Sequence, residues 1–541
     1  MNRFGKTGLI VWGSRSWLFM ALIAAFIAAA LFVQLHIGAY DTDRGQTSDE
    51  AAHFVTSLMI ADYLHHPSAN PIAFAKDYYV HLPRVAIGHW PPVFELLQAL
   101  VFGIFGGTNA TALLLQALIA GLLAGVPSVL VARQLGVIAG LLTGLLIFCS
   151  RNILFEVDTV MADNLLGLLV FLFAWAWSLY YRRRSAGYAL LFAAALISAI
   201  LTKGTAIGLL LLPVAHVALM RDWRFLFRAR TLAALGVVVI LTAAWYVLTY
   251  RLAANGWNYS WGSFTALAVP FFGRAFVAGF GIPATAVFLF GAWCALRPRE
   301  TGPLDVPVFA LAALVQFAFI LVVPADLQTR YLVPVYPCAA VVAVWGLWRL
   351  LNQIFPSRIH NPLIVSGLAS LLVLISIWQG FQAPHIESFR TREAFAKIGT
   401  GKNPLVLISG SSRFEGAMVA TIAQADHARF LYALRASKML SSSSFMGNGY
   451  RTRFGAPAQM QDWLLRNQIG WIVIDTSPDS MRYPHNRMLL ALAESQPKLF
   501  YAASRTARPD GTIAVFKTRA SATTPQHKDS ILAEQAPGGI P

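Results

Sequence analysis

The chain has 541 residues, of which 57% are hydrophobic and only 12% are charged. Soluble globular domains carry about 25% charged residues, so this chain cannot cover its surface against water and much of it must face lipid. The formal net charge of +17 would suggest nucleic acid in a soluble protein, but the sequence has no basic–aromatic array of the kind that binds single strands. We therefore expect no nucleic-acid partner and attribute the basic loops to membrane topology and anionic lipid head groups.

Apolar runs close to the roughly 20 residues that cross a bilayer recur along the chain up to Phe381. The first is interpreted as a retained signal anchor, because no small-residue cleavage site is followed by a polar start. The cysteines lie in apolar runs, without metal-ligand spacing or a disulfide pattern. We predict an α-helical polytopic membrane protein with about eleven spans: residues 17–37, 110–131, 137–153, 163–181, 186–202, 204–219, 231–250, 274–295, 306–323, 331–350 and 361–381.

Lysines and arginines in the short connections gather on one side of these spans, the side that receives the arginines at 182–184. By the positive-inside rule this side is cytoplasmic and holds the amino terminus, and an odd number of spans puts the carboxy-terminal region outside. The apolar segment 90–105 is short, begins with Pro91 and Pro92 and carries Glu95. Counting it as a span would move residues 182–184 outside, so we expect a helix at the outer interface, with proline in its first turn.

The first outer loop, about residues 38–89, contains a helical pattern from Ser48 onward, with apolar residues at i, i+3, i+4, i+7 and i+8 from Ala51. A short amphipathic helix of this kind should lie in the interface plane. After Pro384 the charge rises and the apolar runs shorten. There we expect buried strands at Leu405–Ser409 and Trp471–Asp475, helices at 415–424 and 487–495, and a hairpin of 498–503 with 512–517.

These patterns divide the chain into three parts. Residues 1–384 form a transmembrane catalytic domain, residues 385–519 a small extracytoplasmic α/β domain, and residues 520–541 a tail rich in Ala, Thr, Pro and Gly that we expect to be disordered.

Charges at membrane depth are costly, so the few that occur are candidates for function. The first group is the segment 48–53, which contains Asp49, Glu50 and His53. Ser48 is a good N-cap and acids suit the first turn of a helix, so a purely structural role is one explanation. The alternative depends on position: Asp49 and His53 lie one turn apart at the outer boundary, where a carboxylate could act as a general base toward a hydroxyl.

A second acidic group, Glu156, Asp158 and Asp163, precedes the fourth predicted span. A solvated turn with an N-cap at Asp163 would explain it equally well. The functional alternative is a site for a divalent cation or for orienting sugar hydroxyls. Metal dependence is left open at this stage.

Two cations lie on the side that should avoid positive charge. Lys203, in the string LTKG, could snorkel to the interface, or it could bind a phosphate that Gly204 lets approach the backbone. Arg330 could bind phosphate through two parallel hydrogen bonds. Its neighbour Tyr331 and the more distant His89 are weaker candidates for substrate contacts, because aromatic and histidine side chains are common at membrane interfaces.

The order and topology of these motifs resemble the GT-C fold glycosyltransferases, specifically the branch of protein O-mannosyltransferases and aminoarabinose lipid A transferases. The resemblance covers roughly residues 15–350. It rests on Asp49-Glu50 in a long first outer loop, the Pro91-Pro92 start of an interfacial helix, Asp163 at an outer span start, LTKG at 201–204 and RYLVP at 330–334.

The resemblance implies a polyprenyl-phosphate sugar donor and catalysis on the non-cytoplasmic side. It makes Asp49 the acceptor-side base, Asp163 a second essential acid, and Lys203 and Arg330 contacts to the donor phosphate. Aminoarabinose transferases have a lysine before the interfacial helix where this chain has His89 and Trp90, so the donor sugar stays open. Oligosaccharyltransferases carry a WWDYG motif, and the nearest string here, WNYSWG at 257–262, differs from it.

The sequence thus favours an inverting glycosyltransferase of the bacterial inner membrane. It would move one sugar to a lipid, glycan or protein acceptor outside, with Asp49 and Asp163 catalytic and with substrate contacts from Glu50, His53, His89, Asp158, Lys203, Arg330 and Tyr331. A transporter or flippase would need charges near the midplane, whereas here they collect at one face. A non-enzymatic scaffold whose carboxy-terminal domain binds a partner is the third hypothesis.

Overall fold

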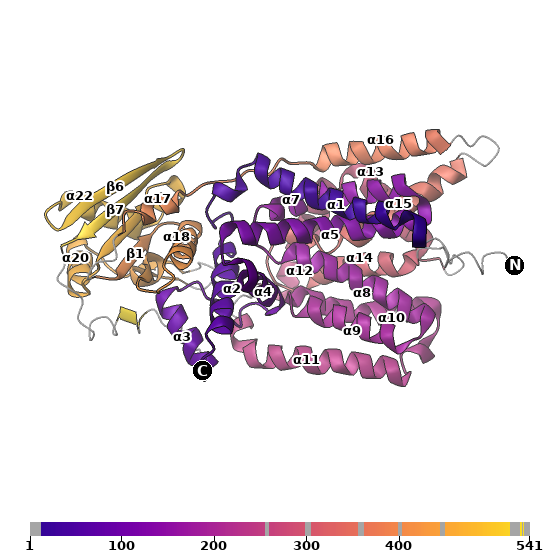
Figure 1. The fold of residues 1–541 in the computed structure, drawn as a ribbon, viewed down its shortest axis with the longest axis horizontal. Helices are drawn as coiled ribbons and strands as arrows, with labels where there is room; N and C mark the ends of the chain where they lie inside the picture. The colour runs from indigo at the N-terminus through magenta and orange to yellow at the C-terminus, as the bar shows by residue number, and fades with distance from the viewer. Residues whose placement is uncertain are drawn as a thin grey trace.

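The computed structural model describes residues 12–254, 259–297, 305–354, 362–398, 403–443, 449–519, 531–532 and 534. Two parts follow one another along the long axis of the molecule: a bundle of helices, and a smaller domain with a mixed sheet (Figure 1). Helices α2 (Glu50–His65), α3 (Pro71–His81) and α4 (Val93–Phe105) lie between them.

Within the described residues, five helices are long and apolar enough to cross a membrane, or six if the bent pair α6 and α7 is one span. The five are α1 (Trp12–His36), α5 (Asn109–Leu135), α8 (Asp163–Arg183), α11 (Ala229–Ala254) and α12 (Trp261–Phe280). The remaining bundle elements are α6 (Val137–Phe148), α7 (Arg151–Val157), α9 (Ala186–Ile200), η2 (Gly204–Leu210), α10 (Leu211–Met220), η3 (Trp223–Phe225), α13 (Ile282–Ala295), α14 (Val306–Val322), η4 (Thr329–Leu332), α15 (Tyr336–Ile354) and α16 (Pro362–Gly380). The chain is a multi-pass membrane protein.

The bundle packs through small residues where helices approach closely. Gly121 and Gly125 on α5 lie against the backbone of Ile27 and Ile23 on α1, where a Cβ atom at either glycine would stand 2.7–2.9 Å from backbone atoms. This G-x-x-x-G spacing lets two membrane helices touch along their backbones. A continuous apolar core joins α1 to the helices that follow.

Two predicted spans are wrong in detail. The span at 274–295 is two helices, because Gly281 takes a left-handed conformation (φ +82°) between α12 and α13 and packs against the backbone of Ser376. The span at 137–153 bends by 72° between α6 and α7, at an extended Ser150. Hydropathy is continuous through Gly281, so it could not reveal that break, whereas the polar residues Ser150, Arg151 and Asn152 do lie at the other.

The helix predicted after Ser48 is confirmed as α2. The residues from Glu50 to Met59 are all buried, whichever face of the helix they occupy, which the amphipathic pattern did not indicate. Helix α4 and α18 (Ser412–Ala425) of the carboxy-terminal domain both pack against α2. The segment predicted at 90–105 is confirmed as a helix, and its 13 residues reach only about 20 Å at 1.5 Å per residue.

The carboxy-terminal domain is built on a five-stranded sheet of order β2-β1-β5-β7-β6, in which β1 pairs in parallel with β2 and β5, and β7 pairs antiparallel with β5 and β6. Both predicted buried strands, both helices and the hairpin are confirmed; β2 and the small β3–β4 pair were not predicted. Most of the predicted tail lies outside the described residues, but Ile531 and Leu532 are buried against this domain. The strands are β1 (Leu405–Ser409), β2 (Tyr432–Arg435), β3 (Ser441–Ser442), β4 (Arg451–Thr452), β5 (Trp471–Asp475), β6 (Phe500–Arg508) and β7 (Gly511–Thr518), and the other helices are α17 (Thr391–Phe395), α19 (Ala436–Met439), α20 (Pro457–Arg466), α21 (Pro478–Met481) and α22 (Pro484–Ser495).

The domain docks directly on the first outer loop. The Gln46 side chain donates to the Glu387 carbonyl oxygen (2.7 Å) and accepts from the Glu387 N–H (3.1 Å), and Arg413 Nε donates to the Gly45 carbonyl oxygen (2.8 Å). Phe54 of α2 and Phe414 of α18 belong to one buried apolar cluster. The loop that presents Asp49 is therefore held from both sides.

Candidate functional site

Four segments far apart in the sequence bring their charges together at the end of the bundle that faces the carboxy-terminal domain. Asp49 lies at the N-cap of α2, Asp163 starts α8, Lys203 precedes η2, and Arg330 lies in η4. Arg330 Nη2 is 2.7 Å from Asp49 Oδ2, and Lys203 Nζ forms an ion pair with Asp163 Oδ1. The two cations that break the charge bias of the loops thus meet the two acids that the sequence singled out.

Tyr331 lies beside both cations. Lys203 Nζ is 4.5 Å from the centroid of its ring, and the Arg330 guanidinium carbon is 5.8 Å from it. An aromatic face attracts cations at these distances. Lys203 and Arg330 therefore lie close to one another despite their like charge, as a site for an anion would require.

The two ion pairs differ in exposure. The Asp49 side chain is 27% exposed, while that of Asp163 is 1% exposed. Burial alone would raise the pKa of the Asp49 carboxyl, but the charge and hydrogen bond of Arg330, together with the charges of His53 and Lys203, outweigh burial and hold this pKa below its ordinary value. Burial would likewise lower the pKa of Arg330, and the Asp163 and Asp49 carboxylates raise it instead. Both members of this pair are charged at neutral pH.

The acidic segment before α8 splits between two environments. Glu156 is fully buried and accepts a hydrogen bond from the Asn164 N–H (2.8 Å). The charges of Asp163 and Lys203 act on its carboxyl. Burial raises the pKa of the Asp158 carboxyl to about 7, and the charges that act on this carboxyl are those of Glu50 and Arg44. The structure therefore brings Asp163 to the cation pair and leaves Asp158 in a neighbouring network.

Glu50 is the centre of that network. Its Oε1 accepts from Arg44 Nη1 (2.9 Å) and the Val160 N–H (3.1 Å), and its Oε2 from the Gln46 N–H (2.9 Å). Its side chain is 0% exposed. Both oxygens are used within the chain to tie the first outer loop to the segment before α8, so the geometry supports a positioning role for Glu50.

His53 forms a second buried cluster with α4. Its Nδ1 is 2.7 Å from Glu95 Oε1, and its ring lies 4.5 Å from that of Trp90, which in turn meets His89 edge-on at 4.7 Å. Glu95 is the acid that the sequence reasoning did not assign to the site. A carboxylate inside a short apolar helix is itself a signal of function, and it would have selected Glu95.

The turn that carries Lys203 is fixed by its neighbours. The Val93 N–H at the start of α4 donates to the Leu201 carbonyl oxygen (2.9 Å), and the Tyr246 hydroxyl donates to the Ile200 carbonyl oxygen (3.0 Å). Gly204 faces this Tyr246 hydroxyl. Helix α4 is thus linked both to Asp49's helix, through His53 and Glu95, and to the Lys203 turn.

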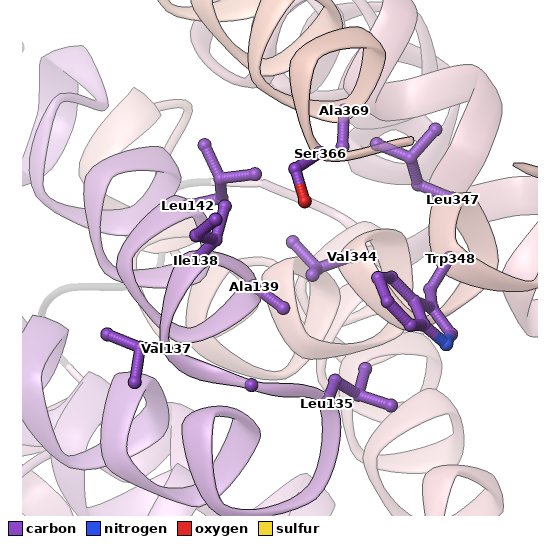
Figure 2. A pocket seen from close by; sticks show the side chains of 11 residues that line it. Leu135, Val137, Ile138, Ala139, Leu142, Val344, Leu347, Trp348, Ser366 and Ala369 are labelled. Atoms are coloured by element: carbon purple, nitrogen blue, oxygen red, sulfur yellow. The ribbon is translucent and has the colours of Figure 1, made fainter. Parts of the chain in front are cut away.

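Among the described residues, no three His, Cys, Asp or Glu side chains lie close enough together to hold a metal ion. A cavity of about 120 Å³ opens elsewhere, where α5 ends and α6 begins, and α15 and α16 complete it (Figure 2). Apolar side chains dominate its lining, with Ser366 as the one hydroxyl shown there. It lies at the end of the bundle away from Asp49 and contains none of the candidate residues.

The comparisons with known proteins agree with this picture. Residues 89–250 match the family described as dolichyl-phosphate-mannose-protein mannosyltransferase. The crystal structure of ArnT from Cupriavidus metallidurans bound to undecaprenyl phosphate is similar over 95% of this chain and 100% of that chain, with 17% identity and a TM-score of 0.58. The oligosaccharyltransferase of Archaeoglobus fulgidus, tethered to an acceptor peptide, is similar over 94% of this chain and 74% of that chain, with 13% identity and a TM-score of 0.55. No curated protein matches the sequence.

The chain therefore has the fold of these solved structures, and the resemblance of its motifs to the GT-C glycosyltransferases is confirmed. The family match over residues 89–250 lies in the branch that the motifs indicated, and the shared fold extends to an oligosaccharyltransferase as well.

Proposed function

We propose that this protein transfers a sugar from a polyprenyl-phosphate donor to a hydroxyl-bearing lipid, glycan or protein acceptor on the extracytoplasmic side of a bacterial inner membrane. The observation that carries the proposal is the convergence of Lys203 and Arg330 over Tyr331, each beside a carboxylate. Two cations at one end of an apolar bundle suit a lipid-linked phosphate, whose tail would stay among the helices.

The proposed topology has eleven crossings, with the amino terminus in the cytoplasm and the carboxy-terminal domain outside. The crossing elements are α1, α5, α6–α7, α8, α9, η2–α10, α11, α13, α14, α15 and α16. Helix α4 is too short to cross. Helix α12 has its last turn beside the outer end of α16, where Gly279 touches Gly380, and we infer that it lies at the outer side.

In the proposed mechanism, Asp49 accepts the proton of the acceptor hydroxyl while the hydroxyl oxygen attacks C1 of the sugar from the face opposite the phosphate. The bond between C1 and the phosphate oxygen breaks, its electron pair stays on the phosphate, and the configuration at C1 inverts. Lys203 and Arg330 stabilise the extra negative charge. Electrostatic stabilisation of a developing anion is commonly the largest single contribution to such catalysis.

Asp163 holds Lys203 in place in this mechanism and keeps it charged although it is largely buried. In this mechanism His89 and Trp90, in the segment directly before α4, contact the sugar. Glu50 fixes the loop that presents Asp49. A divalent cation stays an open question that activity with and without a chelator would answer.

The experiment offers purified protein in lipid nanodiscs a series of polyprenyl-phosphate sugars, with membrane extract as acceptor source, and measures released polyprenyl phosphate. Wild type should consume at least one donor. Asp49→Asn and Lys203→Ala should consume it at least 100-fold more slowly, on the scale of a lost base or a lost anion contact. Arg274→Ala, at an exposed arginine of α12, is the control. If wild type leaves every donor intact, the proposal is wrong.

The topology has a separate test. A reporter enzyme that is active only outside the cytoplasm, fused after Pro384, should be active. An inactive fusion would contradict the eleven-crossing arrangement while leaving the chemistry open to the first experiment.

A further inference from the structure

The mechanism above leaves one buried ionisable pair unused. His53 and Glu95 are 3% and 4% exposed, and His53 Nδ1 lies 2.7 Å from Glu95 Oε1. A histidine and a carboxylate inside an apolar region must be held by a specific partnership, because an unpaired charge there is strongly unfavourable. The pair lies on the two helices that frame the site, α2 and α4.

The partnership fixes which nitrogen of His53 can act as a base. A carboxylate only accepts hydrogen bonds, so the ring nitrogen that faces it, Nδ1, carries the proton. The other nitrogen, Nε2, then presents a lone pair. A histidine oriented by a carboxylate in this way is a common arrangement for accepting a proton.

The ring is also held mechanically. Trp90 lies against it, with 4.5 Å between ring centroids, and Phe94 meets it edge-on at 5.3 Å. The ring that the Glu95 carboxylate contacts therefore has little freedom to rotate. Phe94 and Glu95 belong to α4, and Trp90 lies in the segment directly before it.

Asp49 and His53 are neighbours on α2. They lie one turn apart, the His53 N–H donates to the Asp49 carbonyl oxygen (3.0 Å), and residues at this spacing have their Cβ atoms about 5–6 Å apart. The charge of His53 also acts on the Asp49 carboxyl. Because Arg330 stabilises Asp49 as a carboxylate, Asp49 is a weak base that would hold a proton only briefly.

We propose that His53 is the final acceptor of the proton lost by the acceptor hydroxyl, and that Glu95 is its positioning residue. This inference rests on the proposed function. The proton moves from the hydroxyl oxygen to Asp49 and from there to Nε2 of His53, while the new C1–oxygen bond forms and the C1–phosphate bond breaks as described above. The resulting imidazolium pairs with the Glu95 carboxylate, Asp49 is again a carboxylate beside Arg330, and His53 later releases the proton to water.

The proposal predicts an acid limit to turnover. Four charged or titratable groups lie around His53. They are Glu95 of α4, Asp49 at the start of the same helix, Arg330, which pairs with Asp49, and His89, which contacts Trp90. Once His53 is protonated it cannot accept another proton, so turnover should fall toward acid pH.

The experiment measures release of undecaprenyl phosphate from the donor that wild type consumes, in nanodiscs, across pH 5 to 9. His53→Gln should lower turnover by about 100-fold or more, the scale of a lost acid–base group, and should remove the acid limb. Glu95→Gln keeps a hydrogen bond but not the charge, and should lower turnover about tenfold with the acid limb displaced. Binding of undecaprenyl phosphate, followed by its thermal stabilisation of the protein, should stay within about twofold for both variants.

His65→Gln is the matched control. His65 lies on the same helix, its Nδ1 donates to the Ala61 carbonyl oxygen (2.9 Å), and the variant should behave as wild type. If His53→Gln and Glu95→Gln turn over within about twofold of wild type with the same pH profile, the inference is wrong while the proposed function stands. If wild type consumes no donor, both are wrong. If His53→Gln fails to fold, Glu95→Gln alone decides.

Discussion

Arg330 Nη2 and Asp49 Oδ2 lie 2.7 Å apart although 281 positions separate the two residues in the sequence. The pair links the group proposed to activate the acceptor with a group proposed to hold the leaving phosphate. Arg330 Nε is buried without a hydrogen-bond partner among the described residues. A guanidinium has five N–H donors, so a phosphate can bind Nε while Nη2 keeps its hydrogen bond to Asp49.

This shared arginine predicts a non-additive pair of variants. Arg330→Gln should weaken binding of undecaprenyl phosphate at least tenfold, and Asp49→Asn should leave that binding within about threefold while abolishing turnover. In the double variant, the loss of affinity should differ from the sum of the single losses by about 0.5–3 kcal/mol, the range for residues in contact. Strict additivity in a binding titration would mean that the two side chains act independently.

Variants of Lys203 test whether donor binding depends on the charge of this side chain or only on its size. Its ammonium pairs with the buried Asp163 and lies over Tyr331. Lys203→Met keeps the chain length but leaves Asp163 as an uncompensated carboxylate, which for a buried pair costs about 3–5 kcal/mol, so a lower Tm is expected together with loss of donor binding. Lys203→Met combined with Asp163→Asn should recover Tm but not donor binding. Recovery of both would assign Lys203 a purely structural role.

The sequence allowed part of this site to be predicted. Lys203 and Arg330 stand out because they violate the charge bias of the loops, and Asp49 and Asp163 because acids are rare in this chain. Which cation meets which acid could not be predicted, because the pairing depends on how the helices pack. Glu95 stands out in an apolar segment, but its partner His53 is 42 residues away, beyond any local pattern.

The fold, like the site, could be predicted from the sequence only in part. Hydropathy identifies the membrane helices, short apolar runs identify β1 and β5, and turn residues identify the hairpin, since these are properties of local sequence. The burial of α2 on both faces could not be predicted, because α18, which packs against it, lies far along the chain. The break at Gly281 was missed because glycine is compatible with both a membrane helix and a left-handed turn.

Asp158 predicts a dependence of stability on pH. Burial raises its pKa to about 7, above the unfolded value of about 3.9, so its contribution to stability is fully present below pH 4 and is lost as pH rises through 7. Asp158→Asn should therefore raise Tm at pH 8 and change it little at pH 4. The measurement is Tm in detergent at both pH values, and an equal shift at both would show that titration of Asp158 is not the cause.

Gly281 tests the break in the predicted span. A Cβ atom there would lie 2.5 Å from the Ser376 carbonyl oxygen, and the residue has φ +82°. Gly281→Ala should lower Tm by several degrees, because it adds both a steric clash with α16 and a strained backbone. The control is Gly236→Ala in α11, where a Cβ meets nothing within 4 Å and alanine favours the helix. Equal Tm values for the two variants would contradict the packing at Gly281.

Arg84 offers a test of what the carboxy-terminal domain does for the site. One arm of its guanidinium donates to the Ser48 carbonyl oxygen (3.3 Å), directly before Asp49, and the other donates to the Ser412 carbonyl oxygen at the start of α18. Burial lowers the pKa of Arg84 to about 9, so it stays charged at neutral pH. Arg84→Met should loosen the segment that presents Asp49.

The expected result is a turnover number about tenfold lower, because small displacements of a catalytic group are costly, with donor affinity unchanged since Lys203 and Arg330 are untouched. Arg482→Met is the control, at a side chain of the carboxy-terminal domain that is 61% exposed. A loss of donor affinity without a loss of turnover number would place Arg84 on the donor side and contradict a role in positioning Asp49.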